Sequence, residues 1–336
     1  MQGILNLLLI LGGVAVFLVG LTRISDNFSA IIGQGVERAI KKAAKSRTLC
    51  ALIGSAVAGV SQSSAAANMV VVALADSGVL PFLSACAVIV GTNVGTTVTA
   101  QLVALTVDKE LLVAAVGSLL AFLGLCLGLF KSEKIKALGK ILSGFGFVFI
   151  GINLMTTFTK SLYNYDWFKG LFLVKSPLIV LLNGFFITAI CQSSSVVTSM
   201  LVILTGGGII GLEQAIYMIL GANVGSCVLV IFAASIKGAV AQKTAVFNLV
   251  FNGLGAAVGF LLMIGFGDSI CLLLQKTAQT NSGAVANFHT VFNIASAVVA
   301  LPLLKPVSRL TEILVLSTAR QKVKKSRRKN QFRVKV

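Results

Sequence analysis

Residues 61–64 read Ser-Gln-Ser-Ser, and residues 192–195 read Gln-Ser-Ser-Ser, with the two glutamines 130 positions apart. Each polar run divides an apolar stretch into two short pieces, which are 49–60 and 65–75, then 178–190 and 196–205. A helix needs about 20 apolar residues to cross a bilayer, so each piece is too short to cross alone. Two half-length helices meeting at a polar tip are typical of a re-entrant hairpin, and we expect one at each run. A kinked but continuous spanning helix is the alternative for either stretch taken singly.

The two polar runs belong to a longer internal repeat with the same spacing. Residues 91–98 (Gly-Thr-Asn-Val-Gly-Thr-Thr-Val) match residues 221–228 (Gly-Ala-Asn-Val-Gly-Ser-Cys-Val), again 130 positions later. Two pairs of glycines keep that spacing, Gly54 with Gly184 and Gly78 with Gly208. The segments 49–107 and 179–237 are therefore predicted to be two copies of one unit.

The composition indicates a membrane protein. Of the 336 residues, 57% are hydrophobic and only 11% are charged, whereas a soluble domain carries about 25% charged residues. A soluble enzyme is therefore not expected, and the chain is predicted to be an all-α polytopic membrane protein. Segment 24–47 is amphipathic and basic, so we expect it at the membrane surface. The full-length candidate spans are 3–22, 81–107, 111–130, 141–158, 212–234, 244–266 and 284–304.

The basic residues predict the orientation. The net charge is +18, but Lys and Arg avoid the apolar segments, so nucleic acid is not an expected partner. Of the 28 basic residues, 23 fall in four regions on one side of the alternating topology, which are 23–47, 131–140, 237–243 and 305–336. Cytoplasmic loops carry the excess of Lys and Arg. We therefore expect a cytoplasmic (inner) membrane protein with a cytoplasmic C-terminus, a transport domain at 1–318 and a basic tail at 319–336.

The topology makes the second unit an inverted copy of the first. Three spans separate the two predicted hairpins, and because three is odd, the first unit begins inside and the second outside. Inverted-topology repeats are typical of secondary transporters, whose sites lie near the midplane and are built from discontinuous helices. Both polar runs are expected to converge there, and the chain is expected to be a transporter and not an enzyme.

The site is expected to consist of neutral groups. All ten acidic residues fall at segment ends or in loops, and Lys and Arg do not occur in the middle of a span. In the second half-helix of each pair, the N–H groups of the first turn have no partner in the helix. These N–H groups and the hydroxyls of Ser63, Ser64, Ser194 and Ser195 are both expected to attract an anion. Oxygens suited to sodium come from side chains near the breaks, namely Gln62, Thr92, Asn93, Thr96, Gln192, Asn223 and Ser226. This pattern predicts cation-coupled transport of a small oxyanion.

The motifs as a set resemble the sodium/phosphate cotransporter family, which comprises type II sodium-dependent phosphate transporters and their bacterial relatives. The resemblance covers about residues 5–304 and rests on duplicated Gln-Ser-Ser runs, each followed by Gly-x-Asn-Val-Gly. Residues 131–140 leading into 144–146, and the elements 248–252 and 289–293, which are similar to the family's His-x-x-Phe-Asn motif, add to it. The resemblance implies sodium-coupled transport of inorganic phosphate by alternating access. It implies a phosphate and sodium site at Gln62, Ser63, Ser64, Gln192, Ser193, Ser194 and Ser195.

The chain departs from the family pattern at three positions. Ala65 stands where the first run would carry its last serine, Cys227 matches Thr97 of the first unit, and Asn248 occupies a histidine position. Many bacterial relatives carry a PhoU-type regulatory domain after the membrane part, and the stretch 319–336 is too short for one.

Other interpretations of the same residues stay open. The substrate is phosphate or another small oxyanion such as arsenate or sulfate, and the physiological direction is uptake or export. A membrane regulator that senses phosphate without transporting it is an alternative of a different class. An intramembrane serine hydrolase is disfavoured, because the only histidine, His289, lies far along the chain from both polar runs. We interpret His289 as a packing residue. Sodium and membrane lipid are expected partners, an organic cofactor is not expected, and a homodimer is left open.

Overall fold

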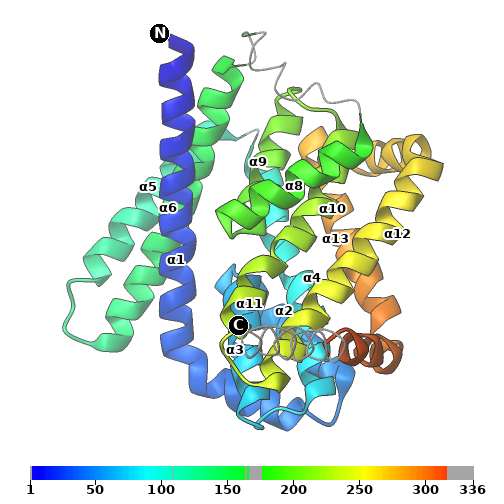
Figure 1. Ribbon diagram of the computed structural model, residues 1–336. Coiled ribbons are helices and arrows are strands. Elements are labelled where there is room, and N and C mark those ends of the chain that lie inside the picture. Colours follow the sequence, from blue (N-terminus) through cyan, green and yellow to red (C-terminus); the bar gives the residue numbers. More distant parts are fainter. Residues whose placement is uncertain (1, 108, 163–164, 166–175, 316–336) are drawn as a thin grey trace, which may run out of the picture.

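The computed structural model describes residues 2–107, 109–162, 165 and 176–315 (Figure 1). Throughout these residues the regular secondary structure is helical, with no strand among them. Seven helical segments are long and apolar enough to cross a membrane, each matching one of the seven predicted spans. The prediction of an all-helical polytopic membrane protein is therefore confirmed. These segments belong to α1 (Gln2–Ala43), α4 (Phe82–Thr106), α5 (Glu110–Leu127), α6 (Glu133–Leu162), α10 (Leu212–Gly225) with α11 (Cys227–Ala234), α12 (Ala239–Thr277) and α13 (Asn281–Ala300).

Helices α1 and α12 both extend well beyond the predicted spans. The span at 3–22 and the amphipathic segment as far as Ala43 form one continuous helix, α1, whose lower part turns to run across the bottom of the molecule (Figure 1). Helix α12 continues past its expected end at Phe266, where the backbone is non-helical (φ −135°, ψ 18°) and the helix kinks. Phe266 lies between Gly265 and Gly267, and glycine lowers the helical preference at such a point. The composition therefore predicted where the regular helix is interrupted, but not that a helix continues after the kink.

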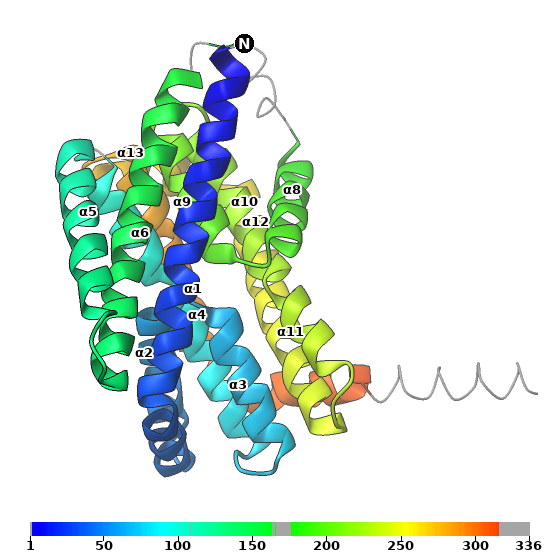
Figure 2. The same cartoon turned by 90° about the vertical axis from the view of Figure 1, so that its left-hand side faces the viewer.

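The predicted half-length helices are present as two pairs. The first pair is α2 (Arg47–Ser61) and α3 (Ser64–Asp76), and the second is α8 (Pro177–Cys191) and α9 (Ser194–Gly206). All four are apolar and shorter than a bilayer-spanning helix. In Figure 2, α2 and α3 lie in the lower half of the molecule, and α8 and α9 lie in the upper half.

The two pairs pack in the same way on the helix that follows them. A Cβ added at Gly54 of α2 would collide with the carbonyl oxygen of Val88 on α4. A Cβ added at Gly184 of α8 would collide with the carbonyl oxygen of Met218 on α10. Gly184 and Met218 each lie 130 positions after Gly54 and Val88. Only glycine allows the two backbones to approach so closely. The repeat in the sequence is thus a repeat of helix packing.

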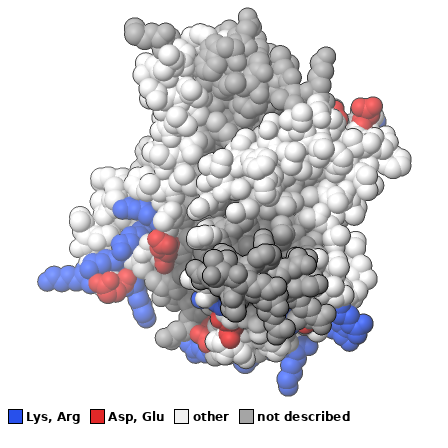
Figure 3. All heavy atoms as spheres, in the orientation of Figure 1, with Lys and Arg blue, Asp and Glu red and all other residues white. Residues whose placement is uncertain are grey.

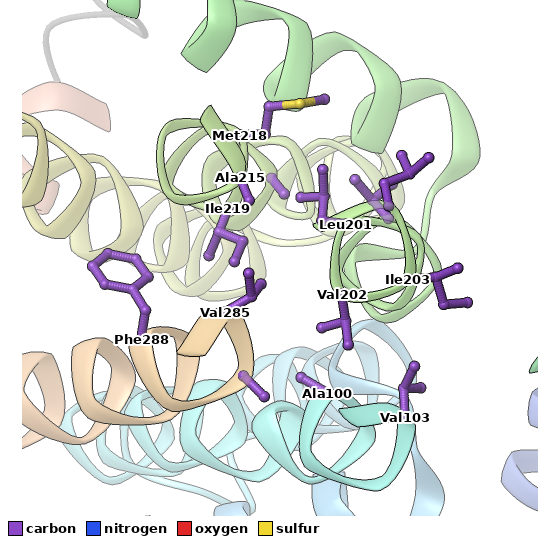
Figure 4. Packing of buried hydrophobic residues seen from close by; sticks show 14 of the residues in the cluster. Ala100, Val103, Leu201, Val202, Ile203, Ala215, Met218, Ile219, Val285 and Phe288 are labelled. Carbon is purple, nitrogen blue, oxygen red and sulfur yellow. The ribbon is translucent and has the colours of Figure 1, made fainter. Parts of the chain in front are cut away.

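The two repeated units meet in a buried apolar core. Helix α4 of the first unit contacts α9 of the second, and α13 contacts both. Figure 4 shows Val202 of α9 facing Ala100 and Val103 of α4, with Val285 and Phe288 of α13 nearby. Because α4 also contacts α2 and α3, it connects the first broken pair to the second.

Candidate functional site

Each helix pair is interrupted by the same backbone geometry. Gln62 and Gln192 have φ values of 55° and 56°, and they are the two non-glycine residues with positive φ in the described chain. This left-handed conformation is uncommon for a residue with a side chain, and each glutamine uses it to end its helix, α2 or α8. We call residues 62–63 the first break and residues 192–193 the second break.

The serine after each glutamine starts the next helix. Ser63 and Ser193 are both extended, with φ of −145°. The hydroxyl oxygen of Ser63 accepts a hydrogen bond of 3.2 Å from the N–H of Ala66, and that of Ser193 accepts one of 3.4 Å from Val196. Serine is a favoured residue at this position because its oxygen satisfies an otherwise unpaired N–H. Each Gln-Ser pair therefore ends one helix and begins the next.

The start of the second helix has the chemistry of an anion site. Beyond the N–H group that Ser63 or Ser193 satisfies, the first turn of α3 or α9 keeps N–H groups without a partner in the helix. Ser64 and Ser194 are the first residues of these helices, and both are buried, as is Ser195. The predicted phosphate residues thus lie where partial positive charge gathers.

The first break is held to α4 by side-chain hydrogen bonds. Thr99 donates a hydrogen bond of 2.6 Å to Oε1 of Gln62, and Nε2 of Gln62 donates to the carbonyl oxygen of Gly59. Further along, Oγ1 of Thr92 lies 2.7 Å from Oδ1 of Asn68 on α3. Gln62 is only 5% exposed. Thr99 and Asn68 were not among the predicted site residues, although their polar character inside apolar helices was a signal.

The second break lacks these bonds. The positions that correspond to Thr99 and Thr92 are Leu229 and Ala222, neither of which carries a hydroxyl. Gln192 is exposed, and within the described residues its side chain makes no hydrogen bond to α10 or α11. The backbone geometry is therefore duplicated, but the contact that holds the break in place is not.

Apart from Gln62 and Gln192 at the breaks, the predicted sodium residues lie on α4 or at the C-terminal end of α10, the helices that follow the two broken pairs. Most of their side chains bond to a carbonyl of their own helix. Asn93 Nδ2 donates to Ile89 (3.0 Å), Thr96 to Thr92 (2.9 Å) and Ser226 to Asn223 (2.7 Å). A hydroxyl that donates its proton in this way keeps oxygen lone pairs for a cation.

Unpartnered buried polar atoms gather in the second unit. Within residues 179–237 they are Oγ1 of Thr188, Oγ of Ser199 and Nδ2 of Asn223, whereas the described side chains of 49–107 contribute none. Thr188 lies one turn before the second break, where its carbonyl accepts the N–H of Gln192. A buried polar atom without a partner is costly and calls for a water or a ligand. Asn223 is one of the predicted sodium residues, whereas Thr188 and Ser199 were not predicted to belong to the site.

A cavity of about 100 Å³ borders the first break. Its walls come from α1, α2, α3 and α4, and most of its lining is apolar. Ser61 and Thr92 are the polar residues that line it. The cavity thus extends to Ser61, the last residue of α2 before the first break, and to Thr92 on α4.

Comparison with known proteins agrees with this geometry. The sequence profile of the Na+/Pi-cotransporter family matches residues 16–157 and 171–297, which include both breaks. The chain belongs to the Na+/Pi-cotransporter family. No solved structure matches it significantly.

Two relatives in this cotransporter family cover most of the chain. The uncharacterized protein YqeW of Bacillus subtilis is 34% identical over 269 residues, covering 79% of this chain and 83% of its own length. YjbB of Escherichia coli, provisionally named an inorganic phosphate export protein, is 25% identical over 314 residues. That alignment covers 93% of this chain but only 56% of YjbB, so the chain spans little more than half of that relative.

The two Phe-Asn elements of this chain have matching structures on α12 and α13. Asn252 donates through Nδ2 to the carbonyl oxygen of Asn248 (2.9 Å), and Asn293 donates in the same way to that of His289 (2.8 Å). Phe247, just before the first element, stacks on Phe251, with the ring centroids 6.3 Å apart. Phe288, just before the second element, stacks on Phe292, with the ring centroids 5.8 Å apart. His289 is 1% exposed, and its Nδ1 has no partner.

Proposed function

We propose that the chain transports inorganic phosphate across the cytoplasmic membrane together with sodium, by alternating access. Membership of the Na+/Pi-cotransporter family supports the substrate and the coupling ion. The observation that carries the proposal is the duplicated break, in which a left-handed glutamine and a capping serine start a new helix twice. Two such helix starts offer hydrogen-bond donors to a compact anion without any side-chain charge.

We propose further that α2–α3 and α8–α9 are re-entrant hairpins of two inverted repeats. The placement of one pair in the lower half and the other in the upper half of Figure 2 supports an inverted relationship. Most of the Lys and Arg side chains visible in Figure 3 gather on the lower half, which favours that end as cytoplasmic. In this proposal 1–318 is the transport domain, and the basic tail at 319–336 is cytoplasmic.

The proposed ligand roles follow from the chemistry of each side chain. Ser63, Ser64, Ser193, Ser194 and Ser195 bind phosphate with the N–H groups of the first turn of α3 and α9, because those groups donate hydrogen bonds. Sodium takes oxygens, since hard cations prefer them. The proposed sodium ligands are Gln62, Gln192, Thr92, Asn93, Thr96, Asn223 and Ser226. Asn223 is the one among them whose amide nitrogen is buried without a partner.

A binding and a flux measurement together test the proposal. Phosphate is titrated calorimetrically into the purified chain in sodium buffer and then in potassium buffer, and labelled phosphate uptake into proteoliposomes is driven by a sodium gradient. We expect binding that requires sodium and uptake that stops when the gradient is removed. Binding and uptake that are equal in potassium would contradict sodium coupling. Phosphate binding without any flux would instead support a sensor that does not transport.

Export is the second candidate function, and the name given to the relative YjbB favours it. Proteoliposomes loaded with labelled phosphate distinguish the two directions, because an exporter releases it under the ion gradient found in the cell. Competition by arsenate and sulfate tests the substrate class in the same vesicles. Inhibition by sulfate as strong as that by unlabelled phosphate would contradict phosphate as the preferred anion.

A further inference from the structure

A second polar site is formed far from the breaks, where the C-terminal helix crosses the start of α4. The helix at 304–315 lies across the ends of the long helices, at the lower right of Figure 1. A cleft of about 510 Å³ separates it from the first turn of α4. Phe82 and Leu83 line one wall of the cleft, and Lys305, Arg309 and Glu312 line the other.

The cleft has an excess of positive charge. Glu312 is the acidic residue in its lining, and this carboxylate is already paired with Nζ of Lys243 on α12 at 3.3 Å. Lys305 and Arg309 are exposed, and neither has a salt-bridge partner in the portion of the chain that the structure describes. They lie four residues apart and therefore on the same face of the helix. Both cations are therefore available to an anionic ligand in the cleft.

The other faces of this helix indicate where that ligand comes from. Leu304, Ser308 and Thr311 are buried against the protein. Leu303, Leu310 and Ile313 are exposed, at 47%, 41% and 64%. A helix with one charged face and one exposed apolar face lies at the membrane interface, with the apolar face toward the acyl chains and the charges among the headgroups. A soluble anion would make no use of the apolar face, whereas a phospholipid would use both.

We propose that this cleft binds the phosphate group of an anionic phospholipid, held by Lys305 and Arg309. Basic pockets between membrane helices are suited to anionic headgroups, and arginine and lysine both donate to phosphate oxygens. The bound headgroup joins the helix at 304–315 to the first turn of α4. Helix α4 also carries Asn93 and Thr99, several turns further along. The site is independent of the phosphate site proposed at the breaks.

Lipid binding is measured as thermal stabilisation of the full purified chain in uncharged detergent. The probes are short-chain phosphatidylglycerol, short-chain phosphatidylcholine and inorganic phosphate. The test variant is Lys305→Gln with Arg309→Gln. The matched control is Lys131→Gln with Lys134→Gln, which removes the same charge from exposed positions just before α6 and in its first turn.

We expect phosphatidylglycerol to stabilise the wild type and the control, and to bind the cleft variant about thirtyfold more weakly. Phosphatidylcholine should have the same effect on the wild type, the control and the cleft variant. Equal stabilisation of the wild type and the cleft variant by phosphatidylglycerol would overturn the proposal. Stabilisation by inorganic phosphate that is lost with Lys305 and Arg309 would also overturn it, because the cleft would then take a free anion. A single symmetrical elution peak and the single variant Lys305→Gln guard against a folding defect, and the single variant is expected to show an intermediate loss.

Discussion

The hydroxyl of Thr99 donates a hydrogen bond of 2.6 Å to Oε1 of Gln62, and this bond has no counterpart at the second break. The residue that corresponds to Thr99 is Leu229, and the side chain of Gln192 is exposed. A repeat that looks nearly symmetrical in sequence is thus asymmetric in its contacts. The side chain of Gln62 holds the first break to α4, whereas among the described residues no side-chain hydrogen bond joins Gln192 to α10 or α11.

Thr99→Val should weaken phosphate binding while preserving the shape of the site. The substitution leaves Oε1 of Gln62 buried without a donor, which costs about 1 to 3 kcal/mol. We expect a lower melting temperature and a severalfold weaker phosphate affinity, measured by thermal unfolding and calorimetry. Thr97→Val is the matched control, because Thr97 is also buried on α4 but donates only to the carbonyl of Val94 (2.8 Å). Equal phosphate affinity in both variants would show that the bond to Gln62 does not support the site.

Removing the two glutamine amides should abolish coupled transport in both cases but change stability in only one. Gln62→Ala leaves the hydroxyl of Thr99 unpaired, so we expect a loss of about 1 to 3 kcal/mol. Gln192→Ala alters an exposed side chain, so its effect on stability should stay within about 0.5 kcal/mol. Sodium-driven uptake into proteoliposomes and thermal unfolding measure the two effects.

Glycine at the same positions distinguishes the contribution of the side-chain amide from that of the left-handed backbone conformation. Gln192→Gly removes the amide while relaxing the left-handed conformation, which glycine adopts without strain. We expect it to be at least as stable as the wild type and still inactive in transport. Wild-type uptake by both Gln62→Gly and Gln192→Gly would refute the assigned site.

The duplicated helix packing predicts matched losses of stability. Gly54→Ala and Gly184→Ala each place a methyl group against a backbone carbonyl that cannot move aside, of Val88 or Met218. Such overpacking costs about 1 to 3 kcal/mol, and we expect both variants to melt at lower temperature. Gly253→Ala on α12 is the control, since nothing lies within 4 Å of its added Cβ. A stable Gly184→Ala beside an unstable Gly54→Ala would mean that the two units do not pack alike.

The features that the sequence could predict are those that follow from local composition. The breaks were predictable because a polar run interrupts an apolar stretch, and the structure ends and restarts helices within a residue or two of the expected positions. The roles of Thr99 and Asn68 were not predictable, because each depends on which side chain faces it across two helices. The continuity of α1 and the extension of α12 were also missed, since hydropathy reports lipid contact and not helical hydrogen bonding.

Asn223→Leu should abolish binding without destabilising the protein. The amide nitrogen of Asn223 is buried without a partner, and the side chain is 5% exposed, so its replacement removes a cost of about 1 to 3 kcal/mol. Its counterpart Asn93 donates a hydrogen bond of 3.0 Å from Nδ2 to the carbonyl oxygen of Ile89, and Asn93→Leu loses that bond. We therefore expect Asn223→Leu to melt at or above the wild-type temperature and Asn93→Leu to melt below it, with phosphate binding measured in sodium buffer lost in Asn223→Leu. Retained phosphate binding in a stable Asn223→Leu would exclude Asn223 from the site and leave its unpaired amide to an ordered water.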